Sequence, residues 1–171
     1  AELRPTSTER DRQTRRHLLS VATGLFASEG YQNATAAKIA NRANVSEPAI
    51  YRHFASKEAL AIAVVNGAWE LFQETLVSNL GSKDNIDARI NALLDTEKSV
   101  YSQPEGKVFY MLGSGATENS DLWQSLREFL ARKLELYKQI AGDEYIAFRL
   151  SILIGIGCLA IVQGQQVFDT T

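Results

Sequence analysis

Four residues that lie close together in the sequence, Tyr51, Arg52, His53 and Lys57, carry side chains that suit contact with phosphate. They supply hydroxyl, guanidinium, imidazole and ammonium donors, which are groups that contact phosphate oxygens in protein–nucleic-acid complexes. Any one of them alone is equally well explained as a solvated surface group or as a satisfied group in a core. Their chemistry indicates a polyanion only if the neighbouring elements hold them on one surface.

A short helix is predicted over residues 36–43. Thr35 precedes it as a good N-cap, and apolar residues recur along one of its faces, with Lys38 outside that face. Asn44 ends the helix, because asparagine tolerates the left-handed backbone conformation that a helix C-terminus requires.

A second helix is predicted from Ser46, its N-cap, to Phe54. Glu47 suits the positive end of the helix dipole, and Pro48 is tolerated in the first turn because its missing N–H costs no hydrogen bond there. Ile50 and Phe54 would share a side that faces the core. The residues left on or near the outward side are Ala49, Tyr51, Arg52 and His53.

The spacing of three residues is typical of a helix-turn-helix. The motif needs a small residue within its first helix, a residue that tolerates positive φ in its turn and an aliphatic residue inside its second helix. Ala40, Asn44 and Ile50 meet these needs. If the motif binds DNA, its second helix enters the major groove. We then expect phosphate contacts from Thr35, Lys38, Tyr51, Arg52, His53 and Lys57, and base-edge contacts from Ser46, Glu47, Pro48 and Ala49.

Charge is unevenly divided along the chain, whose formal net charge is −2. Residues 1–60 hold nine basic against six acidic residues, a charge of +3, and the remainder carries −5. A basic head on an acidic body suits a protein that meets a polyanion at one end only, although chance variation can give a split of this size.

Residues 14–61 resemble the DNA-binding domain of the TetR family of bacterial transcriptional regulators. The resemblance is carried by the TRRHLL opening, the LFASEGY segment with the following AT, the KIA and VS turn region, the IYRHF helix and the SKEAL helix start. It covers only the first third of the chain, because the family has no shared motif beyond about residue 65. Many members have Lys and Gly where this chain has Glu47 and Pro48, so relatives do not give the operator sequence.

The resemblance implies an all-α, Ω-shaped homodimer that binds a double-stranded DNA operator and holds an effector pocket. We therefore expect a three-helix DNA-binding head over 1–55, beginning with a flexible arm over 1–8 and a helix from about Glu9 to Gly30. The helical body over 56–171 would bind effector and form the dimer. Helices are predicted over 56–79, 85–101, 120–141 and 143–168. A further helix, which Pro104 with Glu105 can start, is predicted to include 106–111.

Aromatic residues of the body could line a pocket for a small apolar or aromatic effector. They follow Gly67, which marks either a close helix crossing or a bend in the helix over 56–79. The same side chains could equally be ordinary core residues. The candidate ligand-binding residues are Trp69, Phe72, Gln73, Tyr110 and Trp123.

The run over 150–162 has no charged residue but is too short for a membrane span of about 20 residues. We interpret it as part of a buried helix at a subunit interface. The family resemblance agrees, because its dimers join through their two C-terminal helices. The helices over 120–141 and 143–168 are therefore expected to pair with their copies.

Catalytic and cofactor chemistry is not indicated by the sequence. It has one cysteine, Cys158, and two histidines, with no metal-ligand cluster, nucleotide loop or Ser–His–Asp pattern. We expect no enzyme activity, no cofactor, no metal and no membrane partner, and a reducing cytoplasm as the site of action. Two functions stay open: an effector-released transcriptional repressor, and a DNA-bound structural or adaptor protein that recruits a protein partner without an effector.

Overall fold

Seven labelled helices make up most of the part of the chain that the computed structural model describes, which comprises residues 6–113, 116–117, 120–143, 145–147, 149–152 and 155. These residues contain no strand, so the predicted all-α fold is confirmed. The helices are α1 (Ser7–Asn33), α2 (Ala36–Ala43), α3 (Glu47–His53), α4 (Lys57–Leu80), α5 (Ile86–Tyr101), α6 (Pro104–Gly113) and α7 (Asp121–Ala141).

Helix α1 begins earlier than its sequence pattern predicts. The Thr6 hydroxyl accepts a hydrogen bond of 3.2 Å from the N–H of Glu9, so the helix starts at Ser7 and the prediction that residues 7 and 8 belong to a flexible arm is wrong. Residues 1–5 of that arm lie outside the described residues. Gly30 has a φ of 78° and breaks the helical path, as expected, although one further turn continues to Asn33.

Helices α2 and α3 form the predicted helix-turn-helix. The Thr35 hydroxyl accepts from the N–H of Lys38 at 3.2 Å, and Asn44 has the left-handed conformation with φ 54° and ψ 45°. Ile50 and Phe54 are buried, and Ile39 on α2 is buried beside them in the same cluster. The turn chemistry therefore fixes how the two helices meet.

Helix α4 connects head and body. Ser56 caps it by accepting from the N–H of Ala59 at 3.0 Å, and Gly81 ends it with a φ of 47°. Gly67 is exposed, and within the described part of the chain a methyl group added to it would meet no atom within 4 Å. Among these residues no helix crosses close to Gly67.

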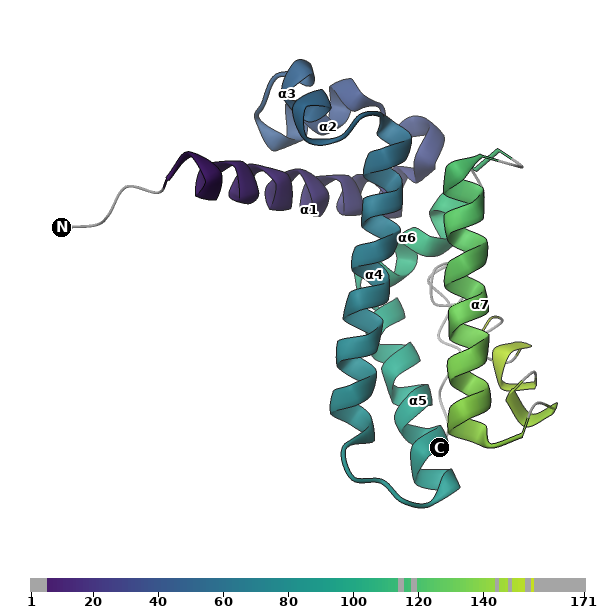
Figure 1. Ribbon diagram of the computed structural model, residues 1–171. Coiled ribbons are helices and arrows are strands. Elements are labelled where there is room, and N and C mark those ends of the chain that lie inside the picture. The colour runs from purple at the N-terminus through teal and green to yellow at the C-terminus, as the bar shows by residue number, and fades with distance from the viewer. Residues whose placement is uncertain are drawn as a thin grey trace.

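The body consists of α4 with α5, α6 and α7. Figure 1 shows α4, α5 and α7 running alongside one another, with α6 between the head and the lower body. Asn85 caps α5 and Ser120 caps α7, while Gly142 ends α7 in the left-handed conformation. Helix α6 starts at Pro104, as predicted, because proline fits the first turn of a helix.

The hydrophobic core is continuous between head and body. One buried cluster joins Phe26 of α1 and Ile50 of α3 to Val108 of α6 and Phe129 of α7, and a second cluster fills the lower body around Phe72 and Tyr137. The division into 1–55 and 56–171 stays a prediction, and apolar packing crosses it. Beyond α7, residues 145–147 and 149–152 are helical, and most of the predicted helix over 143–168 lies outside the described residues.

Candidate nucleic-acid interface and body cluster

The outer surface of the head is formed by α2 and α3, at the end of the molecule opposite α5 (Figure 1). Ser46, Glu47 and Pro48 are exposed at the start of α3, and Tyr51 and Arg52 are exposed one turn later, with Tyr51 48% accessible. Ser46 occupies the cap position, but among the described residues its side chain makes no capping hydrogen bond. Its hydroxyl is therefore presented outward with the first turn of α3.

Ala49 does not lie on this outer surface, and the prediction that places it there is wrong. It is buried, 7% exposed, next to the fully buried Ile50. Helix α3 is rotated so that both residues face the interior of the head. A methyl group on that side cannot reach a base edge, so Ala49 is not part of the candidate interface.

His53 is only partly exposed, at the last position of α3. Its Nε2 atom is buried and has no hydrogen-bond partner within the described ranges. The side chain therefore faces outward less than the helical pattern indicates. Phosphate contact from His53 would need its other ring nitrogen or a change of rotamer.

Lys38 and Thr35 lie on α2 and at its start, and both are exposed. The Lys38 ammonium pairs with the Glu29 carboxylate at 2.6 Å, so a phosphate would compete with that carboxylate. The Thr35 hydroxyl accepts the capping bond and still carries a proton that it can donate.

Lys57 binds the end of α1. Its Nζ donates to the carbonyl oxygen of Tyr31 at 2.8 Å and lies 4.2 Å from the centroid of the Tyr31 ring. A cation at the positive end of α4 is unfavourable, and the Tyr31 carbonyl oxygen compensates for it. A bound phosphate is therefore not needed to explain Lys57 at this position. Burial lowers the pKa of Lys57 from its ordinary value. One of its three donors is thus committed to the fold, and the others can serve an anion.

Helix α1 braces the helix-turn-helix through two side chains that the sequence reading did not assign. The Nε2 atom of His17 lies 3.2 Å from the carbonyl oxygen of Ala43, at the end of α2. The guanidinium of Arg15 lies 4.3 Å from the centroid of the Phe54 ring. These contacts join residues far apart in the sequence, so no local pattern could have indicated them.

The predicted effector residues are only partly brought together. Trp69 stacks on Phe72 at a centroid distance of 5.8 Å and meets Phe129 edge-on at 5.5 Å. Phe72 is 1% exposed, so this cluster is packed. Tyr110 belongs to α6, but its side chain lies outside what the structure describes.

Gln73 and Trp123 do not join that cluster. Gln73 is exposed, because the residue after Phe72 is rotated by about 100° around the helix. Trp123 lies in the first turn of α7, with Arg127 4.8 Å from the centroid of its ring. The prediction that both line one pocket with Trp69 is wrong.

A buried charged cluster lies beside the aromatic residues and was missed. Lys133 Nζ donates to Glu97 Oε2 at 2.8 Å and to the Tyr101 hydroxyl at 3.0 Å, while the Tyr137 hydroxyl donates to Glu97 Oε1. A signal was present: Lys133 lies four residues after Phe129 and four before Tyr137, on the apolar stripe of α7.

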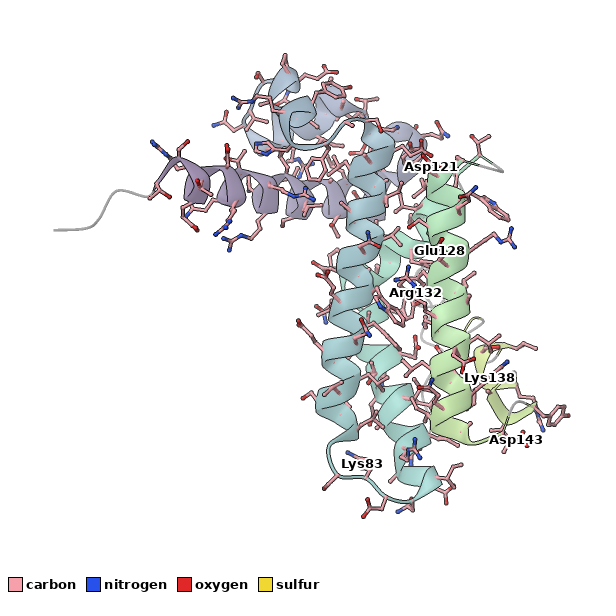
Figure 2. The ribbon with its side chains drawn as sticks, in the orientation of Figure 1. Lys83, Asp121, Glu128, Arg132, Lys138 and Asp143 are labelled. Carbon is pink, nitrogen blue, oxygen red and sulfur yellow. The ribbon has the colours of Figure 1, made fainter. Side chains whose placement is uncertain are left out.

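A shallow depression lies on the outer side of α7. It has a volume of about 360 Å³ and is lined by Gln124, Arg127, Glu128 and Ala131. Figure 2 shows Glu128 and Arg132 along the same helix, and the two form an ion pair of 3.2 Å. The depression is open and has no aromatic residue in its lining, so it does not replace the predicted aromatic pocket.

Among the described residues, no group of three or more His, Cys, Asp or Glu side chains could hold a metal ion. In the same residues, no helix is long and apolar enough to cross a membrane.

The family described as bacterial regulatory proteins, tetR family, matches residues 18–64. The A-factor receptor protein of Streptomyces griseus is 43% identical over 54 residues, which are 32% of this chain and 20% of that protein. The nucleoid occlusion factor SlmA of Escherichia coli is 34% identical over 98 residues, which are 57% of this chain and 42% of SlmA. The match thus spans less than half of either relative.

The fold of the whole described chain is shared with solved structures. A TetR transcriptional regulator from Chloroflexus aurantiacus superposes with a TM-score of 0.77 at 23% identity, covering 91% of this chain and 88% of that one. Residues 18–64, the segment that the family matches, contain the helix-turn-helix and the start of α4. Residues 18–64 are therefore similar to the tetR family of bacterial regulatory proteins, and the described chain shares the fold of a solved regulator of that family.

Proposed function

We propose that the chain is a sequence-specific transcriptional regulator that binds a palindromic double-stranded operator as a homodimer and is released by a small effector. The observation that carries the proposal is the exposed start of α3, where Ser46, Glu47 and Pro48 project from a turn held by Asn44. Two such helices would enter successive major grooves about 34 Å apart.

The proposed contacts to DNA form two sets, one to base edges and one to phosphates. Ser46, Glu47 and Pro48 would approach base edges, because they form the exposed first turn of α3. The surrounding donors would hold phosphates and so fix the position of that turn. The phosphate set is Thr35, Lys38, Tyr51, Arg52 and Lys57, with His53 at its inner edge.

Dimer formation through α7 and the following residues is supported by exposed apolar side chains. Leu130 on α7 is 54% exposed, and Tyr145, Ile146 and Ile152 beyond it are 67%, 40% and 47% exposed. Large exposed apolar side chains are the usual components of an interaction surface. This arrangement fits pairing through 120–141 and 143–168.

The adaptor function remains the second candidate, and the packing of the body favours it. Trp69, Phe72 and Phe129 fill the region where an empty aromatic pocket was expected. One relative is named a receptor and the other a nucleoid occlusion factor, so the relatives' names do not choose between the two candidates.

The proposal is tested by selecting sites from a random duplex DNA library with the full chain. We expect an enriched palindrome, and we expect Arg52→Ala to weaken binding to it by roughly 5- to 150-fold, because about 1–3 kcal/mol is typical of a lost charged contact. Lys98→Ala, which removes an exposed cation from α5, is the control and should change little. No enriched sequence, or equal affinities for the Arg52 variant and the wild type, would refute operator binding.

A further inference from the structure

The side chain of Lys133 is enclosed by aromatic rings inside the body. Its Nζ lies 4.8 Å from the ring centroids of Phe72 and Tyr101, 5.5 Å from that of Tyr137 and 5.9 Å from that of Phe129. The lysine itself is 6% exposed. Three helices contribute the rings, since Phe72 is on α4, Tyr101 on α5 and the other two on α7.

A carboxylate completes this enclosure. Glu97 is 3% exposed and accepts from Lys133 at one oxygen and from the Tyr137 hydroxyl at the other. Tyr101 accepts a second hydrogen bond from the ammonium, at 3.0 Å. A buried charge is tolerated only when it is paired and hydrogen-bonded, and this network supplies both conditions for Lys133.

Rings around a carboxylate are the components of a receptor for an organic cation. Ring faces carry negative potential and attract ammonium and guanidinium groups, most strongly where water is excluded. An anion in the same place would meet the faces of four rings and the Glu97 carboxylate. The surroundings therefore select for positive charge, and Lys133 is the cation that occupies them here.

We propose that this cage of Phe72, Tyr101, Phe129, Tyr137 and Glu97 is the effector site, and that its ligand is an organic ammonium or guanidinium compound that displaces the Lys133 ammonium. The inference rests on the proposed function, in which a small molecule acts on the body. The ligand's apolar part would lie against the neighbouring rings of Trp69 and Phe109, which pack on Phe129 at centroid distances of 5.5 and 4.4 Å.

The position of the cage links its occupant to the head. Phe72 belongs to α4, which runs from the cage to the helix-turn-helix (Figure 1). A ligand larger than the lysine head would change the separation of α4 from α5 and α7. Such a ligand shifts DNA affinity only if it binds the two separations unequally, which exchanging the internal cation for a bulkier one provides.

Three phenylalkyl probes of similar size test the charge preference: 2-phenylethylammonium, 2-phenylethanol and 3-phenylpropionate. We expect the ammonium compound alone to bind the wild type in calorimetric titration and to lower its affinity for the selected DNA. Lys133→Met keeps the unbranched shape and most of the length of the side chain but removes the competing cation. It should bind the ammonium compound roughly tenfold more tightly, because no internal cation must first leave the cage.

Matched variants separate the cage from general stability effects. Adding Glu97→Gln to Lys133→Met should abolish ammonium binding, whereas adding Glu128→Gln, an exposed change on α7, should preserve it. The double variant with Glu97→Gln also removes both buried charges together, so its fold can be checked by its thermal unfolding midpoint without an unpaired charge.

Opposite outcomes would overturn the inference. Binding of 3-phenylpropionate to the wild type and its loss in Lys133→Met would make Lys133 an anion-binding group instead. Failure of the ammonium compound to bind Lys133→Met, or to bind the wild type at any soluble concentration, would leave the cluster as packing alone. If the chain binds selected DNA but the ammonium compound has no effect, the effector site is refuted and the regulator function is retained. If the ammonium compound binds but no DNA sequence is selected, the regulator function is refuted and the cation site is retained.

Discussion

Glu58 at the start of α4 accepts a hydrogen bond of 3.0 Å from the main-chain N–H of Leu122 in the first turn of α7. The two residues are 64 positions apart in the sequence. The preceding residue, Lys57, donates to the carbonyl oxygen of Tyr31 at the end of α1. Two neighbouring side chains thus attach the first turn of α4 both to the head and to the body helix that carries Lys133.

Glu58→Ala should lower the free energy of unfolding by about 1 kcal/mol, because the N-terminus of α7 loses an acceptor and a negative charge. Glu58→Gln should have a smaller effect, since an amide oxygen still accepts the bond. The midpoints of urea unfolding measure both. Glu70→Ala, an exposed change further along α4, is the reference. Equal midpoints for the Glu58→Ala and Glu70→Ala variants would show that the bond to Leu122 contributes nothing.

Tyr31 should make stability fall at alkaline pH. Burial, and secondarily the negative charge of Glu58, raise the pKa of Tyr31 above its ordinary value of 10.0. The unfolded chain therefore loses this proton first, and folding becomes less favourable as pH rises above about 10. Tyr31→Phe removes the ionisation, so the stability of the wild type relative to this variant should decline between pH 9 and about pH 11. A pH-independent difference in urea midpoint would contradict the assignment.

Gly106 should not tolerate a side chain. A Cβ atom there would lie 2.3 Å from the carbonyl oxygen of Val100 and 2.7 Å from Cα of Tyr101, both main-chain atoms at the end of α5. Gly106→Ala should therefore cost roughly 1–3 kcal/mol of stability. The matched change Gly67→Ala, in the open middle of α4, should instead add about 0.5–1 kcal/mol. We expect the midpoint temperature of thermal unfolding to fall in the Gly106→Ala variant and to rise in the Gly67→Ala variant.

The features that the sequence predicted well are local ones. Thr35, Asn44, Ser120 and Gly142 act within a few residues of themselves, so their types indicate where helices begin and end. The outward placement of Tyr51 and Arg52 follows from helical periodicity in the same way. Ala49 was misplaced because α3 is too short for periodicity to fix its rotation about its axis.

The missed features depend on how distant helices are aligned. Glu97 and Lys133 are 36 positions apart, and their contact requires a particular register of α5 against α7. A single amino-acid sequence does not give this register, so it cannot show that Glu97 and Lys133 are in contact. The isolated charge on the apolar stripe of α7 could have indicated a buried lysine, but not its partner. The prediction that Gln73 lines the pocket is wrong because a residue next to Phe72 in the sequence does not lie on the same face of the helix.

The ion pair between Lys38 and Glu29 should restrain DNA binding. Its ammonium and carboxylate atoms are 2.6 Å apart, so Glu29 competes with phosphate for a lysine on the candidate interface. Glu29→Gln releases Lys38 and also removes a negative charge from the head. We expect tighter binding to duplex DNA at low salt and a slope of log affinity against log salt that is steeper by about one unit, as one additional phosphate contact releases one more counterion.

Glu70→Gln makes the same charge change on the exposed side of α4, away from the candidate interface, and is the control for this experiment. Long-range electrostatics alone would raise the affinity of both variants similarly and would leave both salt slopes unchanged. Adding Lys38→Ala to Glu29→Gln should return the slope to that of the wild type or below it. If the slope stays steep in that double variant, the added contact does not come from Lys38, and its place in the phosphate set is wrong.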